Sequence, residues 1–208
     1  ITCIIGGSKI STKIDLIVNL IPKINYMIIG GAMANNFFKY KGNTVGKSKI
    51  EENIDSKVGQ IIHAAEKNNC ELIIPTDVVT AKTFDDLGTA KLLNEIDDDD
   101  MILDIGAKTI FTITEILYKS KTVFWNGPLG FFEKDNFANG TNKVSNTIAQ
   151  LTKDKILTSI AGGGDTFAAI KKSKKEKDFT YISTAGGAFL EWLEGKVLPG
   201  LKVLEIKN

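Results

Sequence analysis

Short apolar runs recur along the chain, and most are followed by a glycine or acidic turn and then by a stretch with helical periodicity. The apolar runs predict strands at 2–5, 26–29, 71–74, 101–104, 122–125, 156–160 and 180–183. Helical patterns lie at 13–21, 32–40, 53–68, 109–120, 140–153 and 186–195. Apolar strands that alternate with helices are typical of a parallel sheet. We therefore expect an α/β fold, a Rossmann-like three-layer domain with a mainly parallel sheet covered by helices on both faces, as a single domain over 1–208.

Glycines gather at the ends of these predicted strands. They are Gly6-Gly7, Gly30-Gly31, Gly106, Gly127, Gly162-Gly163-Gly164 and Gly186-Gly187. In open parallel sheets, ligands bind beyond the carboxyl ends of the strands, where the strand order reverses. Tight turns need some glycines of positive φ, but six glycine sites on one rim exceed that need. We interpret the rim as a nucleotide platform, with one or two glycines serving only the turns.

The composition leaves little material for several classes of site. The chain has 208 residues, a formal net charge of +1, no arginine and one histidine. A near-neutral balance does not favour a nucleic-acid partner. A single histidine, His63, cannot build a histidine metal cluster, and we expect a structural or surface role for it. Cys3 and Cys70 have no paired or metal-like spacing, so we expect cytosolic thiols; the alternative, a disulfide between them, has no support in the sequence.

The sequence shows neither a membrane segment nor a signal peptide. No apolar run reaches the length of a membrane span, and we expect a cytoplasmic protein without a membrane partner. The first residues already read as a buried strand, and no initiator methionine precedes them. We therefore expect the chain to be a piece of a longer protein.

The segment GGSKISTK (6–13) places two lysines, Lys9 and Lys13, at a strand-to-helix boundary. Residues four apart lie on the same face of a helix, so both ammonium groups could lean toward the same strand end. Two lysines beside a glycine turn would suit a polyphosphate whose charge shifts during transfer. The alternative is an ordinary lysine pair on a helix surface.

The segment AGGGDT (161–166) combines a phosphate cradle with a negative charge. Glycine amides at a helix N-terminus bind phosphate oxygens, which Asp165 would repel unless a cation intervened. Mg²⁺ resolves the conflict because it binds carboxylate and phosphate oxygens together. Thr166 could donate its hydroxyl to a phosphate or cap the helix. The alternative for Asp165 is a plain N-cap.

The segment FWNGPLGFFE (124–133) ends a predicted strand at Trp125 and continues into a rigid Asn126-Gly127-Pro128 turn. Glu133 then stands where a carboxylate could accept hydrogen bonds from ribose hydroxyls. From its chemistry alone, this segment could equally be a structural loop.

Two further patterns favour ordinary interpretations. GNTVGKS (42–48) resembles a phosphate-binding P-loop, but Gly42 and Gly46 enclose three residues where that motif needs four, and no strand leads into it. We expect no P-loop here. The acidic run at 97–100 reads as a solvated loop rather than a cation site.

Six motifs together carry a resemblance. GGSKISTKI, MIIGGAMANNF, PTDVV, FWNGPLGFFE, AGGGDT and YISTAGGAFLEWLEGKVLPG occur in the order seen in phosphoglycerate kinase. The chain resembles the carboxyl-terminal, nucleotide-binding half of that family, from its first residues to about Leu201. The resemblance implies transfer of a phosphoryl group between 1,3-bisphosphoglycerate and ADP, giving ATP and 3-phosphoglycerate in glycolysis. It also implies Mg²⁺, with ATP and ADP as the substrate nucleotides.

Roles carried over from the resemblance fall on matching positions of this sequence. Lys9 would stabilise the phosphoryl group in transfer, and Gly186 and Gly187 would open a helix that faces it. Asp165 would ligate Mg²⁺ and Glu133 would bind the ribose. The remaining nucleotide-binding positions would be Lys13, Gly30, Gly31, Gly106, Asn126, Gly163, Gly164 and Thr166.

Three residues depart from the family pattern: Ala32, Ala107 and Ala185 stand where a glycine, a proline and a glycine are usual. We expect slight reshaping of the adenine and phosphate loops. The family's amino-terminal half supplies an arginine-rich patch for phosphoglycerate, and this chain has neither that half nor any arginine. We therefore expect a monomer that binds Mg-nucleotide, while transfer by the fragment alone is slow or absent.

A rival function is a non-catalytic nucleotide-binding module, which would explain Lys13 but leaves little purpose for Lys9. A dinucleotide-dependent oxidoreductase is a weaker rival, because no G-x-G-x-x-G follows any predicted strand.

Overall fold

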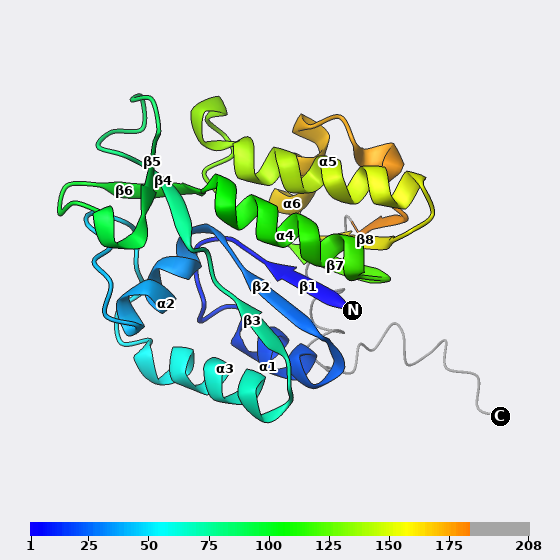
Figure 1. Cartoon of the computed structure of the whole chain (residues 1–208), viewed down its shortest axis with the longest axis horizontal. Helices are drawn as coiled ribbons and strands as arrows, with labels where there is room; N and C mark the ends of the chain where they lie inside the picture. Colours follow the sequence, from blue (N-terminus) through cyan, green and yellow to red (C-terminus); the bar gives the residue numbers. More distant parts are fainter. Residues whose placement is uncertain (184–208) are drawn as a thin grey trace.

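The main sheet has six parallel strands in the order β3-β2-β1-β7-β8-β9 (Figure 1). The structure is a computed structural model that describes residues 1–183. The strands are β1 (Thr2–Ile5), β2 (Tyr26–Ile29), β3 (Glu71–Ile73), β7 (Thr122–Asn126), β8 (Thr158–Gly162) and β9 (Tyr181–Ser183). The predicted α/β fold with a parallel sheet is confirmed.

Helices cover both faces of this sheet, as predicted. One face carries α1 (Ile14–Leu20), α2 (Ala34–Tyr40) and α3 (Asp55–Lys67), and the other carries α4 (Ala107–Lys119), α5 (Asn139–Lys153) and α6 (Gly164–Lys172). Short 3₁₀ helices lie at Ile21–Lys23, Gly31–Met33, Leu93–Glu95, Asp135–Phe137 and Glu176–Asp178. The helical pattern at 186–195 lies outside the described residues.

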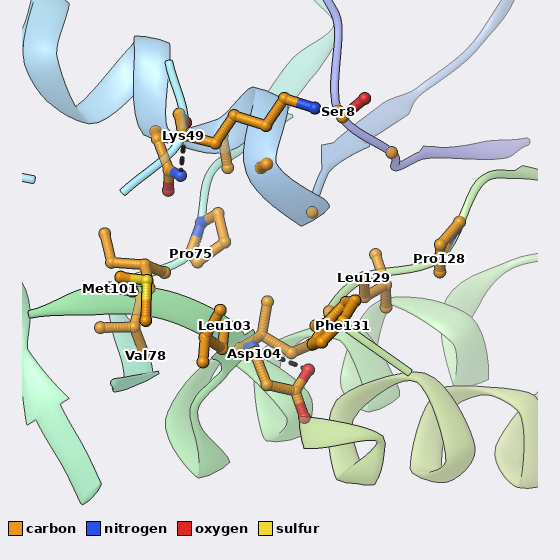
Figure 2. A pocket seen from close by; sticks show the side chains of 18 of the residues that line it. Ser8, Lys49, Pro75, Val78, Met101, Leu103, Asp104, Pro128, Leu129 and Phe131 are labelled. Atoms are coloured by element: carbon orange, nitrogen blue, oxygen red, sulfur yellow. Dashed lines mark hydrogen bonds between the residues drawn. The ribbon is translucent and has the colours of Figure 1, made fainter. Parts of the chain in front are cut away.

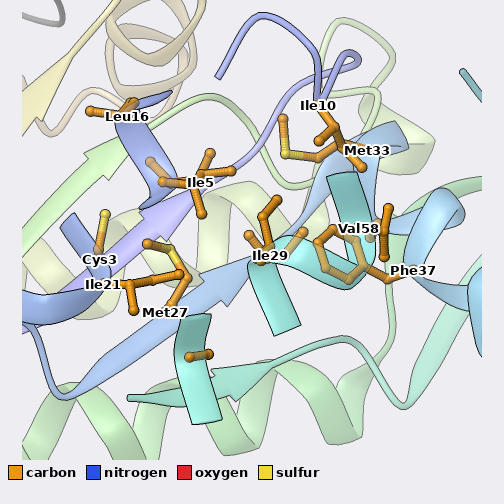
Figure 3. Close-up of a cluster of buried hydrophobic side chains, with 14 of the residues drawn as sticks. Cys3, Ile5, Ile10, Leu16, Ile21, Met27, Ile29, Met33, Phe37 and Val58 are labelled. Carbon is orange, nitrogen blue, oxygen red and sulfur yellow. The ribbon is translucent and has the colours of Figure 1, made fainter. Parts of the chain in front are cut away.

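The apolar strands build two cores because successive side chains point to opposite faces of a sheet. Cys3 and Ile5 of β1 pack into the core under α1 to α3, part of which is drawn in Figure 3. Ile4 points the other way, into the core under α4 and α5. This alternation explains why the strands read as continuous apolar runs. None of the helices within residues 1–183 has the length and apolar composition that crossing a bilayer requires.

A second, three-stranded antiparallel sheet was not predicted. It has the order β5-β4-β6 and consists of β4 (Asp77–Ala81), β5 (Thr89–Leu92) and β6 (Met101–Ile105). The strand expected at 101–104 is present as β6, but it belongs to this sheet and not to the main one. Strand β5 escaped prediction because most of its residues are exposed, so it carries no apolar run. Figure 1 shows the second sheet at one end of the main sheet.

The strand order reverses beside β1. From β1 the chain proceeds outward through β2 and β3 on one side, and through β7, β8 and β9 on the other. The carboxyl ends of β1 and β7 therefore flank the crevice in which open α/β sheets bind ligands. The Gly6 N–H donates to the Asn126 carbonyl at 2.8 Å, and the Gly7 N–H donates to the Pro128 carbonyl at 3.0 Å.

Candidate functional site

A cavity of about 500 Å³ opens between the carboxyl ends of the main strands and the second sheet (Figure 2). Gly7, Ser8 and Gly31 border it on the side of the main sheet, and β6 contributes all five of its residues, Met101–Ile105. The loop after β7 closes another side with residues 128–131. The cavity thus lies at the rim that the glycine pattern had indicated.

The cavity combines an apolar surface with charged groups. Val78, Met101, Leu103, Leu129 and Phe131 supply the apolar surface, and Figure 2 shows them grouped along one side. Charge comes from Lys47, Lys49, Glu133 and Asp165. Such a cavity can bury a flat apolar group while holding a charged group near its border.

Lys13 lies behind the glycine turns rather than inside the cavity. Its Nζ donates a hydrogen bond of 2.7 Å to the Gly6 carbonyl. A methyl group added at Gly127 would lie 2.9 Å from this Nζ, which places the ammonium against that turn. Burial lowers the pKa of Lys13 to about 8, and the nearby charge of Asp165 opposes the shift. The ammonium is therefore held at the crevice in a poorly solvated position.

Lys9 does not share a helical face with Lys13. Helix α1 begins at Ile14, so the spacing of four that we interpreted as helical lies in a loop, and that interpretation was wrong. Lys9 is exposed. Burial acts to raise the pKa of Glu51, but hydrogen bonds from Ser11 and the charge of Lys9 hold it below its usual value. The catalytic role of Lys9 stays a prediction.

The GGGDT segment forms the start of α6. Gly163 is the N-cap, with a φ of 99°, so the alternative that Asp165 is the N-cap was wrong. Gly164 and Asp165 are exposed, and Asp165 lines the cavity. Two exposed residues at a helix N-terminus leave backbone N–H groups and a carboxylate available at the cavity border.

The Thr166 hydroxyl is engaged inside the protein. It donates to the Gly162 carbonyl at 2.8 Å and accepts from the Gly127 N–H at 2.6 Å. Its proton therefore serves Gly162 here and makes no capping hydrogen bond to α6, while a role of Thr166 beside the phosphates stays a prediction. Thr166 fastens the turn after β7 to the end of β8.

Asn126 is buried at the same junction. Its Nδ2 donates to the Gly162 carbonyl at 2.6 Å, while its Oδ1 is buried and has no partner among the described residues. Gly163 lies so close that a methyl group there would be 2.7 Å from Nδ2. A buried amide oxygen without a donor is unusual. A ligand bearing a donor, or a metal-bound water, would satisfy it.

Of the other predicted positions, some line the cavity and others do not. Glu133 is exposed and lines the cavity, and so does Gly31, whose φ is +67°. Gly30 instead faces Leu129, and a methyl group on Gly106 would collide with the carboxylate of Asp77. That carboxylate accepts from the N–H groups of Lys108 and Thr109 at the start of α4.

The glycine at 106 is therefore required by the packing of Asp77, and Gly106 does not line the cavity. Ala32 lines the cavity and Ala107 opens α4. Gly186, Gly187 and Ala185 lie outside the described residues.

Two features of the cavity were missed. Segment 42–48 follows α2, which confirms that no strand leads into it, yet its Lys47 lines the cavity. Asp104 is buried beside the cavity and accepts from the Gly140 and Ile105 N–H groups at 2.7 and 2.9 Å. Burial raises the pKa of Asp104 to about 7 against these hydrogen bonds. In the sequence, Asp104 is a single acid at the end of an apolar run. This pattern is common at strand ends, so it did not mark Asp104 as a candidate site residue.

The acidic run at 97–100 is not a wholly solvated loop. Asp100 is buried and accepts from Lys91 Nζ at 2.7 Å, and Asp97 accepts from the same ammonium at 2.6 Å. Carboxylate oxygens of Asp97, Asp99 and Asp100 lie within 4.8 Å of one another. The ammonium groups of Lys82 and Lys91 form ion pairs with all three carboxylates and so neutralise part of the negative charge of this cluster.

Known proteins resemble the chain over nearly all its length. A family model described as Phosphoglycerate kinase matches residues 1–196. Phosphoglycerate kinase of Wolbachia pipientis subsp. Culex pipiens (strain wPip) is 47% identical over 204 residues, which are 97% of this chain and 52% of the relative. That of Zymomonas mobilis subsp. mobilis is 47% identical over 207 residues, 99% of this chain and 52% of the relative.

Two solved structures of phosphoglycerate kinases are also similar to the chain. Phosphoglycerate kinase from Coxiella burnetii superimposes with a TM-score of 0.93 at 39% identity, covering 98% of this chain and 52% of that one. The enzyme from Pyrococcus horikoshii OT3 gives a TM-score of 0.78 at 30% identity, covering 99% of this chain and 51% of that one. The chain spans about half the length of the relatives it matches.

Proposed function

The chain belongs to the phosphoglycerate kinase family, and from this premise we propose that it is the carboxyl-terminal, nucleotide-binding half of such an enzyme. In this role it binds Mg-ADP and Mg-ATP for phosphoryl transfer between 1,3-bisphosphoglycerate and ADP. The observation that carries the proposal is the cavity at the strand-order reversal, which has Asp165 of the α6 N-terminus at its border.

The cavity suggests how a nucleotide would lie. The apolar surface around Leu103, Leu129 and Phe131 would take the base, because a flat aromatic ring loses little by leaving water. Glu133 lines the cavity and would accept hydrogen bonds from ribose hydroxyls. The phosphates would then extend toward Gly7 and the α6 N-terminus, whose N–H groups and dipole favour negative charge.

The residues present fit Mg²⁺. Asp165 is exposed at the cavity border and accepts no hydrogen bond from the described residues, and the Asn126 Oδ1 is unpaired nearby. Mg²⁺ in such sites is held by one or two carboxylates together with phosphates and water. Asp165 would hold the ion, which neutralises phosphate charge when bound. Lys13 would add a fixed positive charge behind the glycine turns.

Phosphoryl transfer needs positioning and charge stabilisation, and the described residues offer both for the nucleotide. For phosphoglycerate, we propose that the binding groups lie in a part of the enzyme outside these 208 residues. The absence of arginine from the sequence supports this, because bidentate recognition of phosphate and carboxylate relies on the guanidinium group. Efficient turnover of 3-phosphoglycerate by the 208-residue chain alone would contradict it. The monomeric state and the cytoplasmic location stay predictions.

Asp165→Ala tests the site directly. We expect the variant to bind Mg-ADP roughly tenfold more weakly, about 1.4 kcal/mol, while metal-free adenosine binds as before, because only the phosphates bring the metal. Calorimetric titration of both ligands measures this. Asp55→Ala is a matched control, since Asp55 is an exposed acid in the first turn of α3. Equal losses for both ligands would show that Asp165 acts on the fold and not on the metal.

A further inference from the structure

The cavity holds more positive charge than the family resemblance accounts for. An anionic ligand entering it meets the acidic side chains of Asp104, Glu133 and Asp165, and Lys13 lies behind the turns. Within residues 1–183, the cationic side chains that line the cavity are Lys47 and Lys49. Lys47 belongs to the segment 42–48 that fails as a P-loop, and Lys49 follows directly after it.

Lys49 extends across the cavity. Figure 2 shows its side chain pointing toward Ser8, which follows the Gly6-Gly7 turn at the end of β1. Its ammonium forms no ion pair with any carboxylate of the described residues. An exposed cation without a partner inside a cavity is available to a ligand.

Lys47 faces different surroundings although it is only two residues away. Asp99 has its pKa held below the usual value by a hydrogen bond from Lys82, and the charge of Lys47 adds to this effect. Lys47 therefore lies near the acidic cluster at 97–100 and has a local counter-charge. Lys47 is therefore less available to a ligand than Lys49.

The backbone that carries Lys49 is fixed at several points. The fully buried Asn35 donates from Nδ2 to the Lys49 carbonyl at 2.9 Å. The neighbouring Ser48 accepts at Oγ from the Ile102 N–H at 2.8 Å. The Asn36 side chain donates to the Glu51 carbonyl and accepts from the Glu51 N–H. The Glu51 carboxylate also accepts from the Ser11 N–H at 3.1 Å. These bonds tie the segment to α2, to β6 and to the loop that contains Lys9.

We propose that Lys49 is a further nucleotide-binding residue, whose ammonium contacts the phosphate chain from the wall formed by segment 45–51. The inference rests on the proposed function, because it needs the phosphates to lie near Ser8. The ammonium offsets the negative charge of the carboxylates that line the cavity, which would otherwise repel the phosphates. A base-only ligand would not reach it.

The test compares Lys49→Met with Lys57→Met in the 208-residue chain, titrated with Mg-ADP and with adenosine; Lys57 is an exposed lysine of α3 that does not line the cavity. We expect Lys49→Met to weaken Mg-ADP binding by roughly five- to twentyfold, in line with one charge-assisted hydrogen bond. Adenosine binding should change less than about twofold, and Lys57→Met should leave both affinities within about twofold. Lys49→Arg should restore most of the lost affinity.

The outcomes separate the two proposals. If the unmutated chain binds Mg-ADP but Lys49→Met binds it equally well, the role of Lys49 is overturned and the proposed function stands. If both methionine variants lose the same affinity, the effect is a general charge effect and the role of Lys49 is again overturned. If the unmutated chain binds no Mg-ADP at all, the proposed function fails and this inference fails with it.

Discussion

The Asn126 side chain donates a hydrogen bond of 2.6 Å to the Gly162 carbonyl, and so joins the last residue of β7 to the last residue of β8. Thr166 makes a second link, because its hydroxyl bonds both Gly162 and Gly127. The turn after β7 and the start of α6 therefore form one unit, although 36 residues separate Asn126 from Gly162.

Asn126→Ala should weaken this unit. The substitution removes a buried hydrogen bond, and we expect the free energy of unfolding to fall by about 1–2 kcal/mol, since Thr166 still donates to Gly162. Urea denaturation measures the change. Asn68→Ala is the control, because Asn68 makes an exposed side-chain bond to the Ala64 carbonyl, and it should cost less than about 0.5 kcal/mol. An equal cost at both positions would show that the junction is not specially stabilised.

Gly164→Ala separates stability from binding. Gly164 is the first residue of α6, its φ is not in the left-handed region, and nothing lies within 4 Å of an added methyl group. We expect the free energy of unfolding to stay the same or rise by about 0.4–1 kcal/mol. Mg-ADP should nevertheless bind at least roughly tenfold more weakly, because the methyl group would occupy the space of a phosphate oxygen.

The control for this prediction is Gly127→Ala. Gly127 has a φ of +92°, and a methyl group there would collide with Gly6, so we expect a loss of more than about 2 kcal/mol of stability. Wild-type affinity for Mg-ADP in Gly164→Ala would mean that the phosphates do not approach the α6 N-terminus.

The main sheet could be predicted from the sequence because its strands are buried on both faces. Residues 2–5 form an unbroken apolar run for that reason. The second sheet could not be predicted in the same way, since β5 is mostly exposed and its residues 89–92 show no apolar pattern. Its position depends on the pairing of β4 with β5 and β6, which no local pattern records.

The candidate site likewise contains some residues that the sequence could predict and others that it could not. Asp165 and Glu133 could be predicted as cavity residues because they adjoin turns at the ends of main-sheet strands. Lys49 and Asp104 could not, because the walls they form come from a loop and from the second sheet. The nucleotide-binding role of Gly106 stays a prediction, and its packing against Asp77 could not be predicted, because Asp77 is distant in sequence and only the folded chain brings the two together.

Lys13 should couple nucleotide binding to proton uptake. Burial lowers its pKa to about 8, so at pH 8 about half of the free molecules carry a neutral amine. Bound phosphates favour the ammonium form and raise its pKa. We expect Mg-ADP to take up roughly half a proton at pH 8, and its affinity to fall as the pH rises further. Titration calorimetry in two buffers of different ionisation enthalpy measures the uptake.

Lys13→Met provides the control for this coupling. The uptake should vanish in the variant, because the methionine side chain cannot be protonated. Proton uptake that persists in Lys13→Met would assign the coupling to another group.

Asp104 should make stability depend on pH. Burial raises its pKa in the folded chain to about 7 from a usual value of 3.8, so the folded state binds this proton more tightly than the unfolded state. The stabilisation of the folded state by this proton is therefore fully present near pH 4 and is lost as the pH rises through 7. Asp104→Asn cannot ionise, and its other effects on packing do not depend on pH.

The measurement is the difference in unfolding free energy between the unmutated chain and Asp104→Asn, followed from pH 4 to pH 8. Between pH 4 and pH 8, we expect the unmutated chain to lose about 2–4 kcal/mol of unfolding free energy relative to Asp104→Asn, since each unit of pKa shift is worth about 1.4 kcal/mol. Asp55→Asn, at an exposed position, should give a difference that changes by less than about 0.5 kcal/mol. A flat difference for Asp104→Asn would mean that Asp104 ionises in the folded protein as readily as in water, which would require solvent to reach its carboxylate through the cavity.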